Sequence, residues 1–303
     1  MPIMSLVVST LGRSLELRRL LESLERSDFK DFDVVIVDQN EDDRALSAYG
    51  DRQWSFEIRH LRKPQMRGTS RGRNFGWRHT RAPYVMFPDD DCWFPPWLLG
   101  RALAVLQAQN AAIVAGRASD EHGRPINARF EPTAQPITRR NVFTTQIEWA
   151  VLFRREVLES IGGYDEGMGV GAPTPWQAYE GPDIVLRAIA RGYKAYFDPD
   201  LYGHHEDHAS RPVDAVLRRK DRTYARGMGR VLRKHGYGIG SAAFWIGRAA
   251  LGAAASIVFP ARARLYLGRA IGRAEGYFLK EVHPLTPHGR CKGADKNSSS
   301  VHS

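Results

Sequence analysis

Three consecutive aspartates, Asp89, Asp90 and Asp91, follow the short apolar run of residues 84–87. Adjacent carboxylates repel one another, and away from bulk water they are tolerated mainly when a cation lies between them. Hard oxygen ligands select Mg²⁺ or Mn²⁺, and either ion can bind a substrate diphosphate. The structural alternative is a solvent-exposed acidic turn, because acidic residues are common in turns.

Glycine and arginine alternate just upstream, in the stretch GTSRGRNFGW at residues 68–77. Arg71 and Arg73 can form bidentate hydrogen bonds to phosphate or nucleotide oxygens. The three glycines of the stretch would let the backbone approach a ligand closely. A flexible surface loop is the alternative, but the strand that carries the aspartates follows directly and favours a binding role.

A further acidic group lies at Glu180-Gly181-Pro182-Asp183. Pro182 suits the first turn of a helix, apolar residues follow at helical spacing, and Gly192 is a natural end. Glu180 is therefore expected just before a helix N-terminus, facing outward. Alternatively, Glu180 and Asp183 only stabilise the helix dipole, worth about 0.3–1 kcal/mol each.

Hydrophobic periodicity predicts the elements that must position these residues. Residues 3–9 and 32–38 are short, mostly apolar runs typical of buried strands, and four leucines between them recur on one face of a helix. Such a βαβ unit favours a parallel sheet. Open sheets bind ligands outside the carboxyl ends of their strands, and Asp38 and the aspartate triplet both stand at such ends.

The same reasoning extends the pattern along the chain. Further strands are expected at 56–61, 84–87 and 112–116, and further helices at 73–80 and 98–109. The fold class is therefore predicted as α/β, with a mixed, mostly parallel sheet flanked by helices and a C-terminal helical extension. Residues 1–210 would form the catalytic domain, 211–281 a basic amphipathic extension, and 282–303 a disordered tail.

The composition is that of a globular protein kept in a reducing compartment. Hydrophobic residues make up 43% of the 303 residues and charged residues 26%. The two cysteines, Cys92 and Cys291, are far apart and match no disulfide framework or metal-ligand spacing. The N-terminus lacks the features of a secretion signal. These observations predict a cytoplasmic protein.

The positive charge of the chain is concentrated near its C-terminus. Residues 211–281 contain 15 Lys and Arg but only 4 Asp and Glu, whereas the rest of the chain is nearly neutral. A basic segment suits a phospholipid surface, a phosphorylated lipid acceptor or nucleic acid, although a solvated Arg-rich face is equally consistent. Nucleic acid is the weaker choice because no groove-reading or base-stacking motif accompanies the charge.

Within this segment, residues 240–260 are too interrupted for a membrane span, which needs about 20 predominantly apolar residues. A pair of interfacial amphipathic helices fits better, which would place the protein peripherally at the inner face of the cytoplasmic membrane. The alternative is that these helices pack on the catalytic domain.

Taken in order, the motifs resemble those of a family 2 glycosyltransferase with the GT-A (Rossmann-like) fold, over roughly residues 3–208. They are SLVVSTLGR, FDVVIVDQNEDD, GTSRGRNFGW, YVMFPDDDCWFP, IGGYDEG and AYEGPDIVLRAIARGY. The resemblance implies that Thr10, Asp38 and Arg73 bind the nucleotide. The triplet resembles the DxD element of the family, so Asp89 and Asp91 would hold the metal and ribose, with Asp90 close by.

The resemblance also implies the remaining roles. Similar proteins usually carry Glu-Asp where this chain has Glu180-Gly181, and that Asp is the usual catalytic base; Glu180 is therefore the first candidate for the base and Asp183 the second. Tyr164 lies in a stretch that resembles the acceptor-side loop, and Trp176 either stacks on a sugar ring or is packed. His205, or else His204, would complete the metal site, since neutral imidazole is a normal ligand for Mn²⁺.

The expected function is transfer of a sugar from a UDP-, GDP- or dTDP-sugar to a hydroxyl of a saccharide or lipid-linked acceptor, with inversion and with Mn²⁺ or Mg²⁺. Bacterial surface polysaccharide or glycolipid synthesis is the setting implied by the resemblance. Two alternatives remain at this point. A sugar-nucleotidyltransferase would need a Gly/Arg/Lys-rich signature after the first strand, where only Gly12 and Arg13 follow. A non-catalytic membrane or nucleic-acid binding module would leave the acidic site without a purpose.

Overall fold

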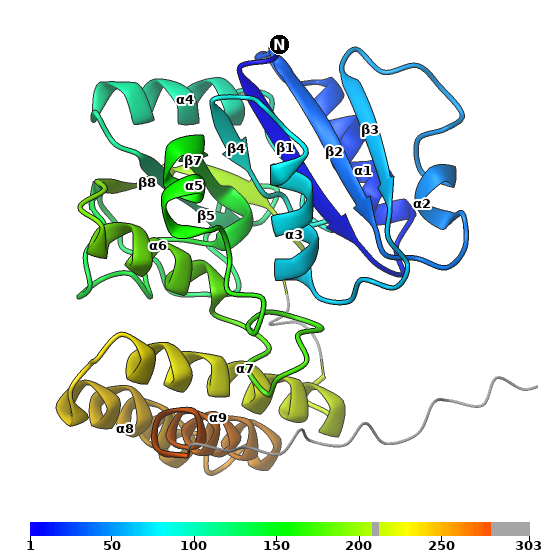
Figure 1. Cartoon of the computed structure of the whole chain (residues 1–303). Coiled ribbons are helices and arrows are strands. Elements are labelled where there is room, and N and C mark those ends of the chain that lie inside the picture. The colour runs from blue at the N-terminus through cyan, green and yellow to red at the C-terminus, as the bar shows by residue number, and fades with distance from the viewer. Residues whose placement is uncertain (208–211, 280–303) are drawn as a thin grey trace, which may run out of the picture.

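The structure is a computed structural model that describes residues 1–207 and 212–279 (Figure 1). Within these residues the centre is an eight-stranded sheet with the order β3-β2-β1-β4-β7-β5-β8-β6. The strands are β1 (Met4–Thr10), β2 (Phe32–Asp38), β3 (Glu57–Arg62), β4 (Tyr84–Met86), β5 (Ile113–Ser119), β6 (Gln135–Pro136), β7 (Val151–Arg154) and β8 (Ala195–His204). The helices of the α/β part are α1 (Leu15–Glu25), α2 (Arg44–Ser47), α3 (Thr69–Arg78), α4 (Leu98–Ala108), the 3-10 helix η1 (Glu148–Ala150), α5 (Arg155–Ile161) and α6 (Glu180–Ala190).

The sheet is mixed, as the sequence predicts. Strands β1 to β4 pair in parallel, β7 runs antiparallel between β4 and β5, and β8 is parallel to β5. The five expected strands lie on β1, β2, β3, β4 and β5, and the expected helices on α1, α3 and α4. The apolar runs of β1 and β2 are almost wholly buried because helices cover both faces of the sheet.

Two apolar clusters fill the space between sheet and helices. On one face, residues of α1, α2 and α4 pack on Leu6, Val8 and Ile36. On the other face, residues of α3, α5 and α6 pack on Val7 and Val35. The alternation of neighbouring residues such as Leu6 and Val7 between the two faces follows from the period of two in a strand.

Helix α3 differs from the expectation in its start and in the role of its glycines. It begins at Thr69, so the Gly/Arg stretch is helical rather than a loop. A Cβ at Gly72 would overlap Ser9, and one at Gly76 would overlap Val7, both on β1. The sequence analysis expected these two glycines to let the backbone approach a ligand. In the structure they let α3 pack closely on the sheet.

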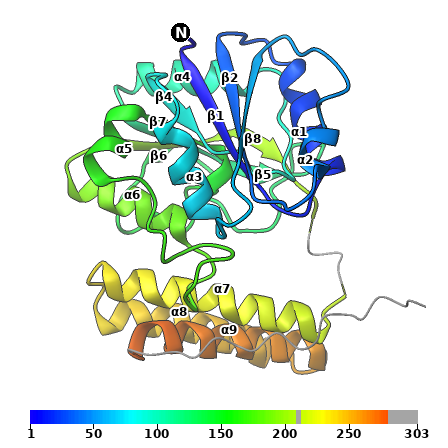
Figure 2. The ribbon, with the colours of Figure 1, turned by 45° about the vertical axis from the view of Figure 1, so that its right-hand side comes forward.

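The chain continues into three helices that form a separate layer beside the α/β part (Figure 2). They are α7 (Ala215–Lys234), α8 (Ile239–Ala255) and α9 (Pro260–Phe278). Helices α7 and α9 approach so closely that a Cβ at Gly276 would overlap the carbonyl oxygen of Arg226. Between them, Glu275 accepts hydrogen bonds from Arg222 and from Nε of Arg226, the latter at 2.7 Å.

Helix α7 also packs on the α/β part, because a Cβ at Gly227 would overlap the carbonyl oxygen of Ala178. At least this helix therefore follows the packing alternative of the sequence analysis. Among residues 1–207 and 212–279, no helix has the length and apolar character needed to cross a bilayer. The expected tail at 282–303 lies outside the described residues.

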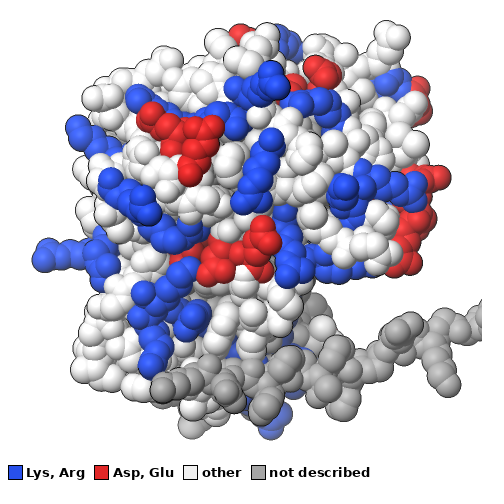
Figure 3. Space-filling model, in the orientation of Figure 1, with Lys and Arg blue, Asp and Glu red and all other residues white. Residues whose placement is uncertain are grey.

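Figure 3 shows how charge is distributed on one face of the molecule. Lys and Arg alternate with Asp and Glu over the α/β part, whereas the visible surface of the helical layer carries blue patches and no red ones. This distribution agrees with the excess of basic residues counted in the sequence of the extension.

Candidate functional site

The aspartate triplet follows β4 and lies at the carboxyl end of β1. Strand β1 runs from the N-terminus at the top of Figure 1 down toward the side where the helical layer lies. Asp89 forms a parallel bridge with Ser9, the residue before the end of β1. Thr10, which ends β1, donates a hydrogen bond from Oγ1 to Oδ2 of Asp90 at 2.7 Å. The triplet and Thr10, predicted as parts of one site, are therefore in contact.

Arginine and histidine side chains offset the negative charge of the triplet. Arg13 pairs with Asp90 at 3.1 Å and also with Asp91, whose other oxygen lies 3.3 Å from Nε2 of His205. Burial raises the pKa of Asp90 to about 7, against the opposing effect of Arg13. Burial acts in the same direction on Asp91, but the hydrogen bonds from His205 and Arg13 prevail and hold its pKa below the usual range. Neighbouring carboxylates thus differ in their affinity for protons.

Arg73 joins the triplet to the start of α6. Its side chain is 2% exposed; it donates from Nη2 to Asp89 Oδ1 at 2.6 Å and from Nη1 to Glu180 Oε1 at 3.2 Å. Burial raises the pKa of Glu180, while the charge of Arg73 opposes the rise. A buried cation with two carboxylate partners holds residues from two distant parts of the chain at one place.

Glu180 does not face outward, as the sequence suggested. It is the first residue of α6, is only 4% exposed, and is preceded by Tyr179, whose φ of 71° is unusual for a residue with a side chain. Its Oε2 atom has no hydrogen-bond partner among the described residues. A strained backbone beside a buried carboxylate oxygen with spare hydrogen-bonding capacity is typical of ligand-binding sites.

The two candidate histidines are turned in different directions. His205 lies beside Asp91, whereas Nδ1 of His204 is 2.7 Å from the carbonyl oxygen of Asp120. Asp38 is buried at the end of β2, where its carboxylate contacts His60 at 3.0 Å and accepts from the amide group of Asn40 at 2.7 Å.

Two predicted residues point away from the triplet. Asp183 has a fully buried side chain that contacts Nε of Arg187 at 2.9 Å, and Nζ of Lys234 and Nε2 of His235, both at 2.8 Å. Arg71 lies on the exposed side of α3, with Nε 3.8 Å from the carboxylate of Glu166. Neither side chain contacts the triplet or Glu180 in this structure.

The two candidate acceptor residues also differ in their surroundings. Tyr164 is buried with its ring 5.1 Å from the guanidinium of Arg73, and its hydroxyl has no hydrogen-bond partner among the described residues. Trp176 is half-buried, with the guanidinium of Arg230 from α7 over its ring at 5.6 Å. Tyr164 thus lies beneath the Arg73 group, and Trp176 lies where the loop before α6 meets the helical layer.

Three residues near the site were not among the predicted ones. Arg13 pairs with the triplet, Glu148 lies beside Gly181, and Tyr224 of α7 is close enough to feel the charges of the site. Burial, together with the negative charges of Glu180 and Glu148, raises the pKa of Tyr224. Arg13 ends the motif SLVVSTLGR, which could have pointed to it, whereas no motif marks Glu148 or Tyr224, which reach the site through tertiary packing.

The donor chemistry of the triplet partly fits a divalent ion. Asp91 and His205 place oxygen and imidazole nitrogen atoms side by side, a combination suited to Mn²⁺. Among the described residues, however, no group of three or more His, Cys, Asp or Glu side chains is arranged to hold a metal. Arg13 and Arg73 instead form ion pairs with the carboxylates of the triplet. Metal binding therefore requires these arginine side chains to move.

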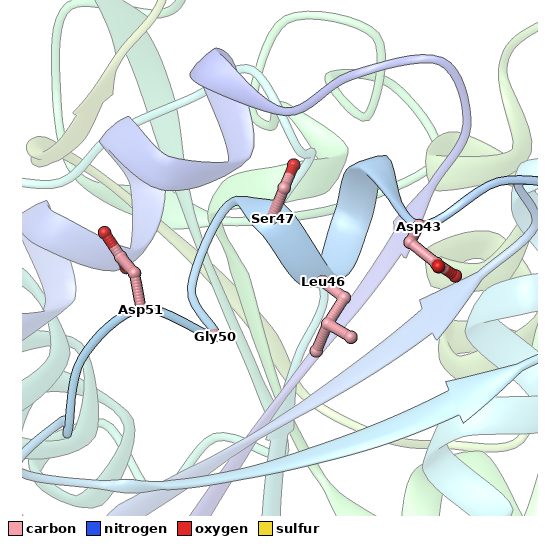
Figure 4. Close-up of a pocket in the computed structure, with 5 residues that line it drawn as sticks. All are labelled: Asp43, Leu46, Ser47, Gly50 and Asp51. Atoms are coloured by element: carbon pink, nitrogen blue, oxygen red, sulfur yellow. The ribbon is translucent and has the colours of Figure 1, made fainter.

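A separate surface depression lies beside α2 and is lined by Asp43, Leu46, Ser47, Gly50 and Asp51 (Figure 4). None of the predicted site residues lines it. The triplet and the Arg73 group therefore remain the candidate active site.

Comparison with known proteins identifies the family. The model of Glycosyl transferase family 2 matches residues 5–162, a little more than half of the chain. An uncharacterized glycosyltransferase of Haemophilus influenzae is 28% identical over 195 residues, which cover 61% of this chain and 62% of the relative. A GalNAc(5)-diNAcBac-PP-undecaprenol beta-1,3-glucosyltransferase of Campylobacter jejuni is 29% identical over 207 residues, 65% of this chain and 66% of the relative. The chain thus spans slightly less than two thirds of these relatives.

Solved structures show the same fold. The mannosyltransferase PcManGT from Pyrobaculum calidifontis, in complex with GDP-Man and Mn²⁺, has a TM-score of 0.61 at 17% identity and covers 92% of this chain and 88% of its own. The 1–349 piece of TarS from S. aureus has a TM-score of 0.56 at 16% identity, with 91% of each chain covered, and was also solved with UDP-GlcNAc. This result favours a glycosyltransferase over the two alternatives of the sequence analysis, a sugar-nucleotidyltransferase and a non-catalytic binding module. The chain belongs to glycosyltransferase family 2 and has the GT-A fold.

Proposed function

We propose that this glycosyltransferase moves a sugar from a nucleoside-diphosphate donor to an acceptor hydroxyl with inversion at the anomeric carbon. The observation that carries the proposal is the bridge from Asp89 through Arg73 to Glu180. It joins the strand ends suited to a nucleotide to a carboxylate suited to an acceptor. The names of the structural neighbours, solved with UDP-GlcNAc or with GDP-Man and Mn²⁺, support this class of donor.

In this proposal the nucleotide is held at the strand ends. Thr10 and Asp38 lie where β1 and β2 end, Asp89 and Asp90 meet the ribose, and Arg73 faces the diphosphate. Arg71 remains a candidate for the diphosphate, although it reaches the donor only if it leaves Glu166.

Asp91 and His205, with Asp89 nearby, are the residues that would hold Mn²⁺ or Mg²⁺. Such an ion, when bound, supplies positive charge that stabilises a departing diphosphate. Arg13, which pairs with Asp90 and Asp91, is a cation next to these residues that could also meet the diphosphate.

The acceptor hydroxyl approaches from the side of α6. Its proton passes to a carboxylate there, and Glu180 is the first candidate among the residues predicted from sequence. Trp176 and Tyr164 remain the candidates for contact with the sugar rings.

The test uses the full-length chain with Mn²⁺ and a panel of UDP-, GDP- and dTDP-hexoses, measuring equilibrium binding and slow hydrolysis of the donor. We expect one nucleotide class to bind, and Asp91→Ala to abolish turnover. Asp42→Ala is the matched control, because Asp42 is exposed and, among the described residues, its ion pair is with Arg44. The proposal fails if no donor is bound or hydrolysed and Asp91→Ala behaves like the control.

We further propose a lipid-linked acceptor and a cytoplasmic protein that docks peripherally on the inner face of the membrane, with residues 1–210 as the catalytic domain and 211–281 as the docking extension. The Campylobacter relative is named for a PP-undecaprenol acceptor. At the turn between α8 and α9, Ile257, Val258 and Phe259 are 76%, 74% and 63% exposed, and Arg262 and Arg264 follow. Apolar side chains beside arginines suit an anionic phospholipid surface.

Co-sedimentation with vesicles tests the docking. We expect the chain to bind phosphatidylglycerol vesicles more tightly than phosphatidylcholine vesicles, and Val258→Asp to weaken the binding. Leu15→Asp is the matched control, since Leu15 is an exposed apolar residue on α1. Equal binding by Val258→Asp and the wild type would contradict the docking surface.

A further inference from the structure

Glu180 is poorly placed to act alone as the base of the proposed reaction. Its Oε1 atom accepts from Arg73, and the side chain is almost wholly buried. The ion pair with this buried cation favours the charged carboxylate and opposes the rise in the pKa of Glu180 that burial causes. One oxygen of Glu180 is therefore committed to holding Arg73, and only Oε2 is left for a ligand.

A second carboxylate, Glu148, lies beside the start of α6. It begins η1, just before β7, and is only partly buried. A Cβ at Gly181 would come within 2.8 Å of Glu148 Cβ and 3.5 Å of its Cα. The absence of a side chain at residue 181 is therefore what allows Glu148 to lie next to Glu180.

Glu148 differs from the other site carboxylates in its partners. Asp89, Asp91 and Glu180 each form an ion pair, whereas Glu148 forms none with any residue in 1–207 or 212–279. Burial, and then the charges of Glu180 and Asp89, raise the pKa of Glu148 to about 7. A carboxylate with a pKa near neutrality and no ion-paired cation to hold it charged suits a general base.

The surroundings of Glu148 also offer hydrogen bonds that nothing in the described part of the chain uses. Both polar atoms of the Gln146 side chain are buried without a partner there, and its Oε1 lies 3.2 Å from the Cβ position of Gly181. Oε2 of Glu180 is also buried without a hydrogen-bond partner among the described residues. Buried polar atoms are rarely left unpaired, so these atoms mark a place where a ligand rich in hydroxyl groups would bind.

We infer that Glu148 is the catalytic base of this enzyme and that Glu180 positions Arg73. Glu148 supplies a carboxylate at the place where Gly181 has no side chain. The inference rests on the proposed function. In the step, the acceptor oxygen forms a bond to the anomeric carbon while the bond from that carbon to the diphosphate oxygen breaks. The bonding electrons leave with the nucleoside diphosphate, and the hydroxyl proton passes to Glu148, which releases it to solvent.

The experiment compares Glu148→Gln with wild type in the full-length chain, using the nucleotide-hexose selected by the panel and water as the acceptor. Gln keeps the size of the side chain but cannot take the proton. We expect donor affinity within twofold of wild type and turnover reduced at least ~100-fold. Glu148→Asp should retain a measurable part of the turnover. The matched control is Glu156→Gln, an exposed residue of α5.

The outcomes separate the inference from the function on which it rests. Wild-type turnover in Glu148→Gln would overturn the role of Glu148 while leaving the glycosyl transfer intact. Loss of donor binding together with turnover in Glu148→Gln and Glu148→Asp would overturn it too, since the residue would then hold the donor. If the wild type itself neither binds nor hydrolyses any donor, the proposed function fails first.

Discussion

Asp183 of α6 accepts a hydrogen bond from His235, just after α7, with Nε2 and Oδ1 2.8 Å apart. Lys234 contacts the same oxygen at 2.8 Å, and Arg187 contacts the other at 2.9 Å. The carboxylate of Asp183 therefore links the α/β part to the helical layer. In this position it faces three cationic or hydrogen-bonding groups and no open space.

Asp183→Asn should lower the free energy of unfolding by about 1–3 kcal/mol, because it removes the buried counter-charge of the partly exposed Arg187 and leaves Lys234 with Asp165 alone. Urea denaturation followed by circular dichroism measures the change. Donor binding at low temperature should persist. A variant that is as stable as wild type but has lost turnover would instead return Asp183 to the role of base.

The stabilisation by Asp183 should depend on pH with a defined sign. Although burial raises the pKa of Asp183, His235, Lys234 and Arg187 outweigh that effect and hold it below the usual range. A lowered pKa means that the stabilisation is fully present above the unfolded value of about 4 and is lost as the pH falls through the folded value. The difference in stability between wild type and Asp183→Asn should thus be constant from pH 7 to 5 and shrink below pH 4. A difference that grows on acidification would refute this assignment.

Arg73 and Arg71 provide a matched pair on one helix. Arg73→Met removes a buried cation from two carboxylates and should cost about 3–5 kcal/mol of stability, together with most of the donor affinity. Arg71→Met removes a weak surface pair and should change stability by less than about 0.5 kcal/mol. Thermal unfolding and donor titration measure both variants. A tenfold loss of donor affinity in Arg71→Met would show that Arg71 does reach the diphosphate.

Gly181→Asp tests the close approach of η1 to α6. The new Cβ would crowd Glu148 and Gln146, and overpacking of this kind typically costs about 1–3 kcal/mol. We expect a lower melting temperature and reduced turnover. Gly247→Asp on α8 is the control, since nothing lies within 4 Å of its Cβ position. Equal melting temperatures for the two variants would mean that Glu148 is not held next to Gly181.

Removal of divalent ions tests the metal ligands. Treatment with EDTA should abolish turnover, and addition of Mn²⁺ should restore it. Asp91→Asn and His205→Asn should each raise the Mn²⁺ concentration for half-maximal turnover about 10-fold or more. His204→Asn should not, because its ring contacts Asp120 rather than Asp91. Full turnover in EDTA would remove the metal from the mechanism.

The sequence by itself determined the elements and the order of the motifs. The short apolar runs of β1 and β2 and the period near 3.6 in α1 are local properties of the chain, so they predict strands and helices directly. The placement of Asp38 and the aspartate triplet at strand ends followed from the same local patterns. The helix that starts near Glu180 could also be predicted, because Pro182 marks its first turn and Gly192 its end.

Only the tertiary structure decided which side chains meet. Arg73 and Glu180 are 107 residues apart, and their contact depends on how α3 and α6 pack on the same face of the sheet. Packing also brings Asp183 into contact with His235, just after α7, and places Gly72 against Ser9. These contacts depend on burial, register and close approach between distant segments, which leave no repeating pattern along the chain.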